Sequence, residues 1–437
     1  MGATEKCPIA ETSQATRAYT AKLSLYSDHK ESSLLTPEQT WSTLSEHVAA
    51  LPTHTLPIDE ARGHVLAEPV YADRDLPPAD RSAMDGFAVR AEDLQTAPVT
   101  LRVVGEVAAG SPTAPVVVPG TCARIFTGAN LPPGADAVAI IESTREDASG
   151  QITFAVAERP GANILRRGEN ARQGSELVPT GRILRSVHIG MCAAAGATHV
   201  RVVRKPLAAI ITTGRELLGP GTAAGPHQER DSNGPMLAAA LAEAGFSVAF
   251  ARRVPDDADT IMASMRDALN VADAVVLSGG VSVGAYDFVP ACVIAIGART
   301  LVHGVAMKPG KPFLFALAPK SQLIFGLPGN PLSAATGLHE FVLPALRRAA
   351  GWPASACRPL VRASLRAAVT NTPGRQRYVL ATLAWAATGP EVAAVPSQSS
   401  ADLAAGARAD GVIIVPADAH GIDAGVLVDF RPWRVWP

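Results

Sequence analysis

The spacing of hydrophobic residues changes character along the chain, and the clearest pattern lies between residues 206 and 350. Short apolar runs there alternate with longer segments in which apolar residues recur at helical spacing. The predicted strands are Leu207–Thr212, Ser247–Ala251, Ala274–Ser278, Leu314–Leu317 and Leu323–Gly326. The predicted helices are Asn233–Ala244, Asp257–Asn270, Asp287–Ile296 and Pro331–Ala349. This alternation predicts a three-layer α/β domain with a mostly parallel sheet.

Two flanking regions carry shorter apolar runs between Gly and Pro residues, which is typical of β-structure. In residues 68–185 the predicted strands are Val99–Val104, Val116–Val118, Ala137–Ile141 and Ile152–Val156, and a helix Val187–Ala195 and a strand Val200–Val203 follow. In residues 352–437 they are Leu360–Leu365, Tyr378–Trp385, Val392–Val395, Gly411–Val415 and Val426–Phe430. We expect a small β-rich module before the α/β domain and a β-barrel or sandwich after it.

The first 35 residues are polar, rich in Ser and Thr, and without periodicity, which predicts a disordered tail. A helix signal follows, because Thr36 can cap the helix, Pro37 suits its first turn and Gln39 completes a capping box. Apolar residues then recur at helical spacing up to Pro52, where we expect the helix to end.

Charge and composition exclude several classes of protein. The 437 residues include 39 Lys and Arg against 40 Asp and Glu, so nothing global favours binding to nucleic acid or to an anionic membrane. The five cysteines are far apart and the ten histidines form no metal-binding pair, which argues against a disulfide framework or a zinc site. No apolar run approaches the about 20 residues of a membrane span, and residues 1–33 lack a targeting pattern. We therefore expect a cytoplasmic protein.

A glycine-rich turn follows the predicted strand Ala274–Ser278 and contains Gly279, Gly280 and Ser282. Backbone N–H groups in such a turn can converge on an anion, and open α/β sheets bind ligands at this edge. The alternative is a tight turn that packs helix on strand. Asp287 follows, where it is either a helix cap or a ligand of a hard cation such as magnesium.

The segment from Lys308 to Pro312 holds two lysines in a loop stiffened by two prolines and one glycine. Exposed lysines usually serve only solubility. Because a stiff loop keeps the charges of Lys308 and Lys311 close together, this loop favours an oxyanion between them.

Other polar groups sit at turns where their roles stay open. Asn330 and Ser333 begin the predicted helix after a strand, where they can cap it or bind an anion. Glu216 follows the first predicted strand as a surface charge or a ligand group. Asp85 and Thr127 lie in segments that read as ordinary turns. No Ser–His–Asp or Cys–His nucleophile is evident, so the chemistry implied is the handling of anions and metal.

Together these segments resemble the MoeA/gephyrin E-domain family, the molybdopterin molybdenumtransferases or molybdenum insertases. The resemblance covers about residues 36–432 and rests on strings in a fixed order: RSAMDGFA at 81–88, RIFTGA at 124–129, RRGEN at 166–170, TTGREL at 212–217, DSN at 231–233, SGGVSVGAYDF at 278–288, MKPGKP at 307–312 and GLPGNPLS at 326–333. Several rare strings in one order are far more specific than any one of them.

The resemblance implies a multidomain α/β plus β architecture. A discontinuous linker and dimerisation domain would comprise 36–67 and 165–203, a β-rich inserted domain 68–164, a MogA-like α/β domain 204–350 and a barrel-like domain 351–437. It implies insertion of molybdate into adenylated molybdopterin with release of AMP, a homodimer, a Mg²⁺ cofactor, and molybdopterin adenylyltransferase and molybdoenzymes as partners.

The same resemblance assigns residues to roles. Asp256 and Asp287 would hold magnesium and, with Ser282 in the turn of Gly279 and Gly280, the phosphates of the pterin nucleotide. Molybdate would lie among Lys308, Lys311, Ser333, Arg375 and Ser400, beside Asn330. The catalytic positions implied are Asp85, Thr127, Glu216, Asp256 and Asp287.

The chain departs from the family pattern at Arg215, which stands where Asp is usual, at Asn170, which replaces Asp, and at Gly304, which replaces Lys. Each change removes or reverses a charge. One alternative is therefore a degenerate paralogue. Because the fold is shared, the others are a non-catalytic scaffold and a molybdopterin adenylyltransferase, although that enzyme needs the α/β domain alone.

Overall fold

The computed structural model describes residues 34–282 and 287–433, which form two compact units. One unit contains the described residues up to His54, Gly63–Val65 and those from Val203 onward. The other contains Thr55–Arg62 and Leu66–Val202. The finer domain boundaries drawn from the sequence stay predictions.

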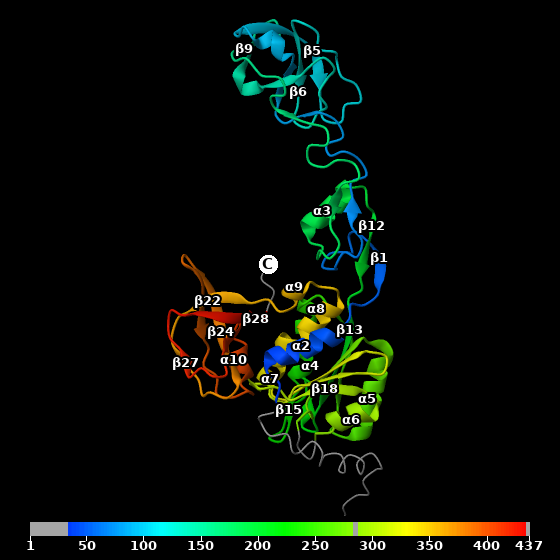
Figure 1. Ribbon diagram of the computed structural model, residues 1–437, viewed down its shortest axis with the longest axis vertical. Helices are drawn as coiled ribbons and strands as arrows, with labels where there is room; N and C mark the ends of the chain where they lie inside the picture. Colours follow the sequence, from blue (N-terminus) through cyan, green and yellow to red (C-terminus); the bar gives the residue numbers. More distant parts are fainter. Residues whose placement is uncertain (1–33, 283–286, 434–437) are drawn as a thin grey trace, which may run out of the picture. The chain divides into compact units, whose positions relative to one another are not determined.

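A six-stranded sheet forms the centre of the larger unit (Figure 1). Its order is β16 (Ser247–Val254), β13 (Leu207–Thr213), β17 (Ala274–Ser278), β21 (Leu323–Leu327), β20 (Leu314–Leu317) and β18 (Arg299–His303). The first four strands are mutually parallel, and β20 and β18 pair antiparallel. The predicted mostly parallel sheet is confirmed, and β18 is a strand that the sequence pattern missed.

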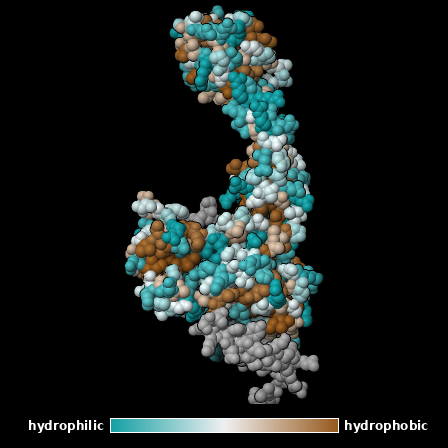
Figure 2. Space-filling model, viewed as in Figure 1, coloured by the Kyte–Doolittle hydropathy of each residue, from teal (hydrophilic) through white to brown (hydrophobic). Residues whose placement is uncertain are grey.

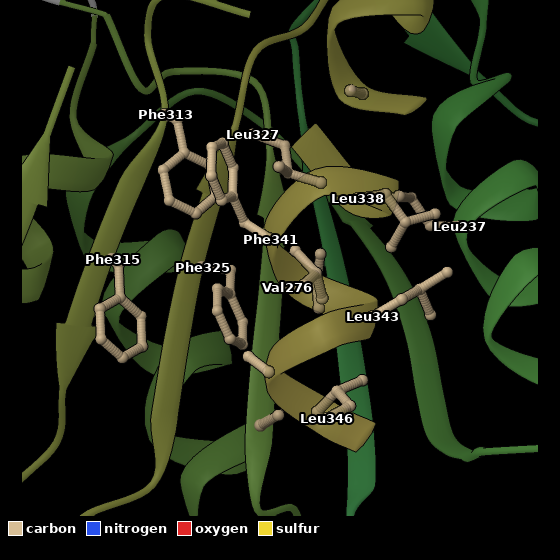
Figure 3. Close-up of a cluster of buried hydrophobic side chains, with 14 of the residues drawn as sticks. Leu237, Val276, Phe313, Phe315, Phe325, Leu327, Leu338, Phe341, Leu343 and Leu346 are labelled. Carbon is tan, nitrogen blue, oxygen red and sulfur yellow. The ribbon is translucent and has the colours of Figure 1, made fainter. Parts of the chain in front are cut away.

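Helices cover both faces of this sheet. The larger unit contains α2 (Pro37–His47), α4 (Asn233–Glu243), α5 (Ala258–Val271), α6 (Val289–Ala295), α7 (Pro331–Gly337), α8 (Leu343–Ala349) and α9 (Ala354–Cys357). Leu237 of α4 and Leu346 of α8 pack on one face with Val276, Phe315 and Phe325 (Figure 3). The opposite face packs against α5 and α6. Each of these large apolar side chains contributes about 1.5–3 kcal/mol when buried, so the sheet is a rigid base for what lies at its edge.

Two helix boundaries and the interior of a third helix differ from the sequence predictions. Helix α6 begins at Val289 with Phe288 as its N-cap, so Asp287 lies before the helix and is not its cap. The predicted helix Pro331–Ala349 contains a π-turn, Leu338–Val342, between α7 and α8. Helix α2 has the predicted capping box but ends at His47, well before Pro52.

The predicted C-terminal β-structure is a closed barrel. Its strands are β24 (Gln376–Ala386), β25 (Gly389–Ala394), β22 (Val361–Leu365), β28 (Leu427–Pro432) and β26 (Gly411–Val415), and β26 pairs back to β24. Accessory elements are β19 (Met307–Lys308), β23 (Val369–Thr370), β27 (Gly421–Ile422) and α10 (Leu403–Gly406). Figure 2 shows hydrophobic residues gathered on one face of the barrel. Exposed apolar side chains of the barrel strands include Trp385 and Leu427.

A buried carboxylate joins the barrel to the α/β domain. Glu340 lies in the π-turn with no exposed surface, and its Oε1 accepts from Arg431 Nε at 2.7 Å while Oε2 accepts from Arg358 Nη2 at 2.7 Å. Burial alone would raise the pKa of Glu340, but the two guanidinium groups outweigh it and hold the pKa below its usual value. The hydroxyl of Tyr378 also points to Oε2, at 3.4 Å.

The smaller unit contains a six-stranded sheet: β7 (Ala137–Ile140), β4 (Gly86–Val89), β6 (Thr121–Ile125), β5 (Val99–Val107), β9 (Gln151–Phe154) and β8 (Thr144–Glu146). Other short strands of the chain are β1 (Thr53–Pro57), β2 (Val70–Tyr71), β3 (Arg81–Ser82), β10 (Ile164–Leu165), β11 (Glu176–Val178), β12 (His199–Val203), β14 (Leu217–Leu218) and β15 (Glu229–Arg230). Helix α3 spans Ser186–Ala194. The predicted β-rich module is confirmed, but Val116–Val118 forms no strand, because Val117 makes an isolated backbone bond to Pro133 instead of a ladder.

Residues 1–33 of the predicted tail lie outside the described residues, whereas Leu35 pairs with Val305. Within the described ranges, no helix combines the length and apolar character that a membrane crossing requires.

Candidate functional site

The glycine-rich turn after β17 needs its glycines for steric reasons. Gly279 has φ +99°, and a Cβ there would lie 2.4 Å from the carbonyl oxygen of Thr213. Gly280 has φ +60° and faces the hydroxyl of the same threonine. The turn therefore brings the ends of β13 and β17 together, and this close packing is compatible with either role that the sequence left open.

Asn233, at the start of α4, ties this edge of the sheet together. Its Nδ2 donates to Ser278 Oγ at 2.9 Å and to the carbonyl oxygen of Gly329 at 2.7 Å. Ser278 Oγ in turn donates to the carbonyl of Pro328 at 3.1 Å. One amide therefore links the end of β17 to the loop between β21 and α7.

Asp231 also belongs to this edge. It is buried, and its carboxylate accepts from Thr212 Oγ1 at 2.7 Å and from the Gly234 amide at 2.9 Å. Neither Asp231 nor Asn233 was predicted from the sequence as a site residue. The only signal was the polar DSN string before an apolar helix.

The acidic residues predicted to handle metal lie at the same edge. Asp256 follows β16 and is half-buried, and its Oδ1 is buried without a hydrogen-bond partner among the described residues. Asp287 is half-buried just before α6, while Glu216 and Ser282 are exposed. Within 34–282 and 287–433, no group of three or more acidic, His or Cys side chains is arranged to hold a metal. The unpartnered oxygen of Asp256 fits magnesium, which uses one or two carboxylates together with phosphate oxygens.

Arg215 lies beside these carboxylates. Its Nη2 approaches the backbone carbonyl of Asp256 at 3.4 Å, and the side chain is exposed. The departure from the family pattern at this position therefore places a cation close to the proposed metal ligand.

A pocket of about 700 Å³ lies between the barrel and the α/β domain. Its walls include the residues that the sequence analysis assigned to molybdate and its surroundings: Lys308, Lys311, Asn330, Ser333, Arg375 and Ser400. These residues come from separate segments of the chain. The structure thus brings the predicted oxyanion residues together around one cavity.

Local structure explains how these residues reach the pocket. Strand β19 pairs parallel with β24, which puts Lys308 opposite Arg377. Asn330 is the N-cap residue of α7, but its side chain donates to Ser400 Oγ at 2.8 Å instead of capping the helix. The carbonyl of Ser400 accepts from the Leu332 amide at 3.1 Å, so the loop around Ser400 caps α7 from outside.

In the smaller unit, Asp85 and Thr127 are in contact. The carboxylate Oδ1 of Asp85 accepts from the Thr127 amide at 2.7 Å and from its hydroxyl at 2.8 Å. These bonds hold the pKa of the exposed Asp85 below its usual value, so it is a carboxylate at neutral pH. Two turns that looked unrelated in the sequence therefore form one polar group.

Comparison with known proteins identifies the family. Residues 35–196 match the MoeA N-terminal region (domain I and II), residues 209–348 a probable molybdopterin binding domain, and residues 362–433 the MoeA C-terminal region (domain IV). A molybdopterin molybdenumtransferase of Staphylococcus epidermidis is 34% identical over 379 residues, which cover 85% of this chain and 89% of the relative. The chain belongs to the MoeA family. A molybdopterin molybdenumtransferase of Staphylococcus aureus is 32% identical over 387 residues, 87% of this chain and 91% of the relative.

Solved structures of MoeA proteins have the same fold. A molybdopterin biosynthesis MoeA protein from Pyrococcus horikoshii has a TM-score of 0.75 and 31% identity, and covers 92% of this chain and 100% of its own. A second structure from that organism has a TM-score of 0.78 and 27% identity, and covers 91% of this chain and 100% of its own. The predicted multidomain architecture of this MoeA protein is therefore confirmed.

Proposed function

We propose that this protein is a molybdopterin molybdenumtransferase, which inserts molybdenum from molybdate into adenylated molybdopterin with release of AMP in molybdenum cofactor biosynthesis. One observation carries the proposal: the cavity between barrel and α/β domain collects Lys308, Lys311, Ser333, Arg375 and Ser400 around a single space. Membership of the MoeA family supports it.

Molybdate binds in this pocket as the oxyanion substrate. Lys308, Lys311 and Arg375 supply positive charge, and charge-assisted hydrogen bonds are the strong ones in proteins. Ser400 Oγ accepts from Asn330, so its own proton is left for donation to an oxyanion. Ser333 lies buried in the first turn of α7, at the pocket wall.

The pterin nucleotide binds at the carboxyl edge of the sheet. The turn at Gly279 and Gly280, with Ser282, receives phosphate oxygens. Asp256 and Asp287 hold Mg²⁺, and the unpartnered Oδ1 of Asp256 supports this role. When bound, the cation neutralises phosphate charge and stabilises the departing AMP. Glu216, exposed at this edge, orients the ligand.

The protein acts as a homodimer in which Asp85 and Thr127 of one subunit complete the site of the other. Helix α3 supports a second copy, because its apolar residues Val187, which is 80% exposed, Ala193 and Ala194 face solvent in the single chain. The product passes to molybdoenzymes, and a molybdopterin adenylyltransferase supplies the substrate.

The decisive experiment measures AMP release from adenylated molybdopterin, with and without molybdate and magnesium. The transferase should release AMP in a manner that depends on both ions. A scaffold or a degenerate paralogue, in which Arg215, Asn170 and Gly304 have abolished activity, would release none. An adenylyltransferase would instead consume ATP and molybdopterin.

The metal assignment has its own test. Asp287→Asn keeps the size of the side chain but removes the charge that a hard cation needs. It should abolish the magnesium dependence of AMP release. If both activity and metal response survive, Asp287 is not a metal ligand.

The shared site is tested by mixing two inactive homodimers, one with Asp85→Ala and one with Asp287→Ala. In a mixed dimer one site carries both lesions and the other carries neither. Equal mixing makes half the dimers mixed, so about a quarter of wild-type activity should return. If subunit exchange is demonstrated by mass and no activity returns, each site is built within one chain.

A further inference from the structure

The pocket is unusual in its charge. Among the lining residues within 34–282 and 287–433, four are cationic, namely Lys308, Lys311, Arg375 and Arg377, and none is Asp or Glu. The chain as a whole balances 39 basic residues with 40 acidic ones. The described part of the wall therefore gives Arg375 and Arg377 no carboxylate, and an anionic ligand would supply that charge.

Arg377 is the one of these four cations to which the proposed function assigns no role. The register of β19 and β24 puts it opposite Lys308, and neighbouring strands are about 4.8 Å apart. Its Nη1 donates to the carbonyl oxygen of Thr370 at 2.6 Å, and Thr370 is itself part of the pocket wall. This bond fixes the guanidinium at the wall and occupies one of its five N–H donors.

The size of the pocket explains how a fourth cation acts. About 700 Å³ is typical of drug-sized ligands, whereas a tetraoxoanion has five atoms. Four cations therefore need not all contact it. Apolar wall residues, including Leu332, Leu380 and Val412, concentrate the electrostatic field, so a cation across the pocket still stabilises the bound anion.

We propose that Arg377 is a further binding residue of this pocket and makes it select doubly charged tetrahedral oxyanions over singly charged ones of the same shape. The proposal rests on the proposed function, in that the pocket binds an oxyanion. Coulomb energy scales with the product of the charges, so each cation stabilises a dianion twice as much as a monoanion. Losing one cation must then cost the dianion twice as much free energy.

The experiment compares equilibrium binding of molybdate and of perrhenate, a tetrahedral monoanion, at one ionic strength. Arg377→Gln should weaken molybdate binding about 10-fold and perrhenate binding about 3-fold. Arg377→Lys keeps the charge and should keep the wild-type ratio of the two affinities. The control is Arg362→Gln on the outside of the same barrel, whose side chain is 64% exposed and paired with Asp429, and it should change neither affinity.

Two results would overturn the proposal. One is a molybdate affinity of Arg377→Gln equal to that of Arg362→Gln. The other is an equal loss of affinity for molybdate and perrhenate, which would mean that Arg377 does not discriminate between ions by their charge. If the wild-type protein binds neither ion, the oxyanion pocket of the proposed function is wrong and this inference falls with it. If it binds molybdate and Arg377→Gln has no effect, the inference alone is wrong.

Discussion

Two pairs of arginines at the barrel have opposite surroundings. Arg375 and Arg377 face a pocket whose described lining contains no carboxylate. Arg358 and Arg431 surround the fully buried Glu340. The second pair has its counter-ion built into the fold, so it serves to hold the barrel against the α/β domain. The first pair leaves its charge to be met by something that enters, and this difference separates a structural joint from a binding site.

The largest expected effect comes from breaking the buried joint. Glu340→Gln leaves the buried Arg431 and the largely covered Arg358 without a negative partner, and removing one member of a buried ion pair costs about 3–5 kcal/mol of stability. Denaturant unfolding measures the loss. The matched control, Glu391→Gln, removes a surface pair between the half-buried Glu391 and the exposed Arg366, whose closest atoms are 3.8 Å apart, and it should cost less than about 1 kcal/mol. Equal effects of the two variants would mean that the buried cluster is not a joint.

The same joint predicts the dependence of stability on pH. The pKa of folded Glu340 lies below its ordinary value of 4.5, so its contribution is fully present above that value. The contribution is lost as the pH falls through the depressed folded pKa. The stability difference between wild type and Glu340→Gln should therefore be largest at neutral pH and shrink in acid. A difference that stays constant from pH 7 to pH 3 would contradict the ionised state of Glu340.

Substitutions in the pocket should instead lower ligand affinity and leave the stability of the protein unchanged. Lys308→Ala and Lys311→Ala should each lower molybdate affinity about 10- to 100-fold, because a charge-assisted hydrogen bond is worth roughly 1.5–3 kcal/mol. Both variants should stay folded in the same denaturant assay. Unchanged molybdate affinity in both variants rules out the oxyanion role of this loop.

The smallest effect is expected for a neutral donor. Ser400→Ala removes a hydroxyl that accepts from Asn330 and can donate into the pocket. A neutral hydrogen bond is worth about 1 kcal/mol, so molybdate affinity should fall about 5-fold. Isothermal titration calorimetry distinguishes this loss of affinity from the larger losses expected for the lysine variants. A loss as large as that of Lys308→Ala would mean that Ser400 holds the loop rather than the ligand.

Much of the fold could be predicted because its causes are local. The strand Ala274–Ser278 and the barrel strand Gly411–Val415 have the predicted bounds, since a continuous apolar run between turn residues defines each. The capping box at Thr36 also depends on neighbours three residues away. Val116–Val118 was wrong because an apolar run becomes a strand only when another strand pairs with it.

The functional residues also divide into those that neighbouring residues reveal and those that depend on distant partners. The lysine loop could be recognised because its stiffness and its charges lie in five consecutive residues. Asn233 and Glu340 could not, because their partners are 96 and 91 positions away along the chain. Arg377 was missed for a similar reason: its meaning depends on which other charges line the pocket, and barrel closure decides that.

The amide of Asn233 has a consequence for how ligands act on each other. It bonds the end of β17, beside the glycine turn, and also Gly329, next to Asn330 at the pocket. If a nucleotide that shifts the turn alters the pocket through this amide, thermodynamic reciprocity requires an oxyanion to alter nucleotide affinity by the same factor. The order in which the two substrates bind then depends on one coupling free energy between their sites. Asn233→Ala should reduce this coupling free energy without removing a side chain assigned to either ligand.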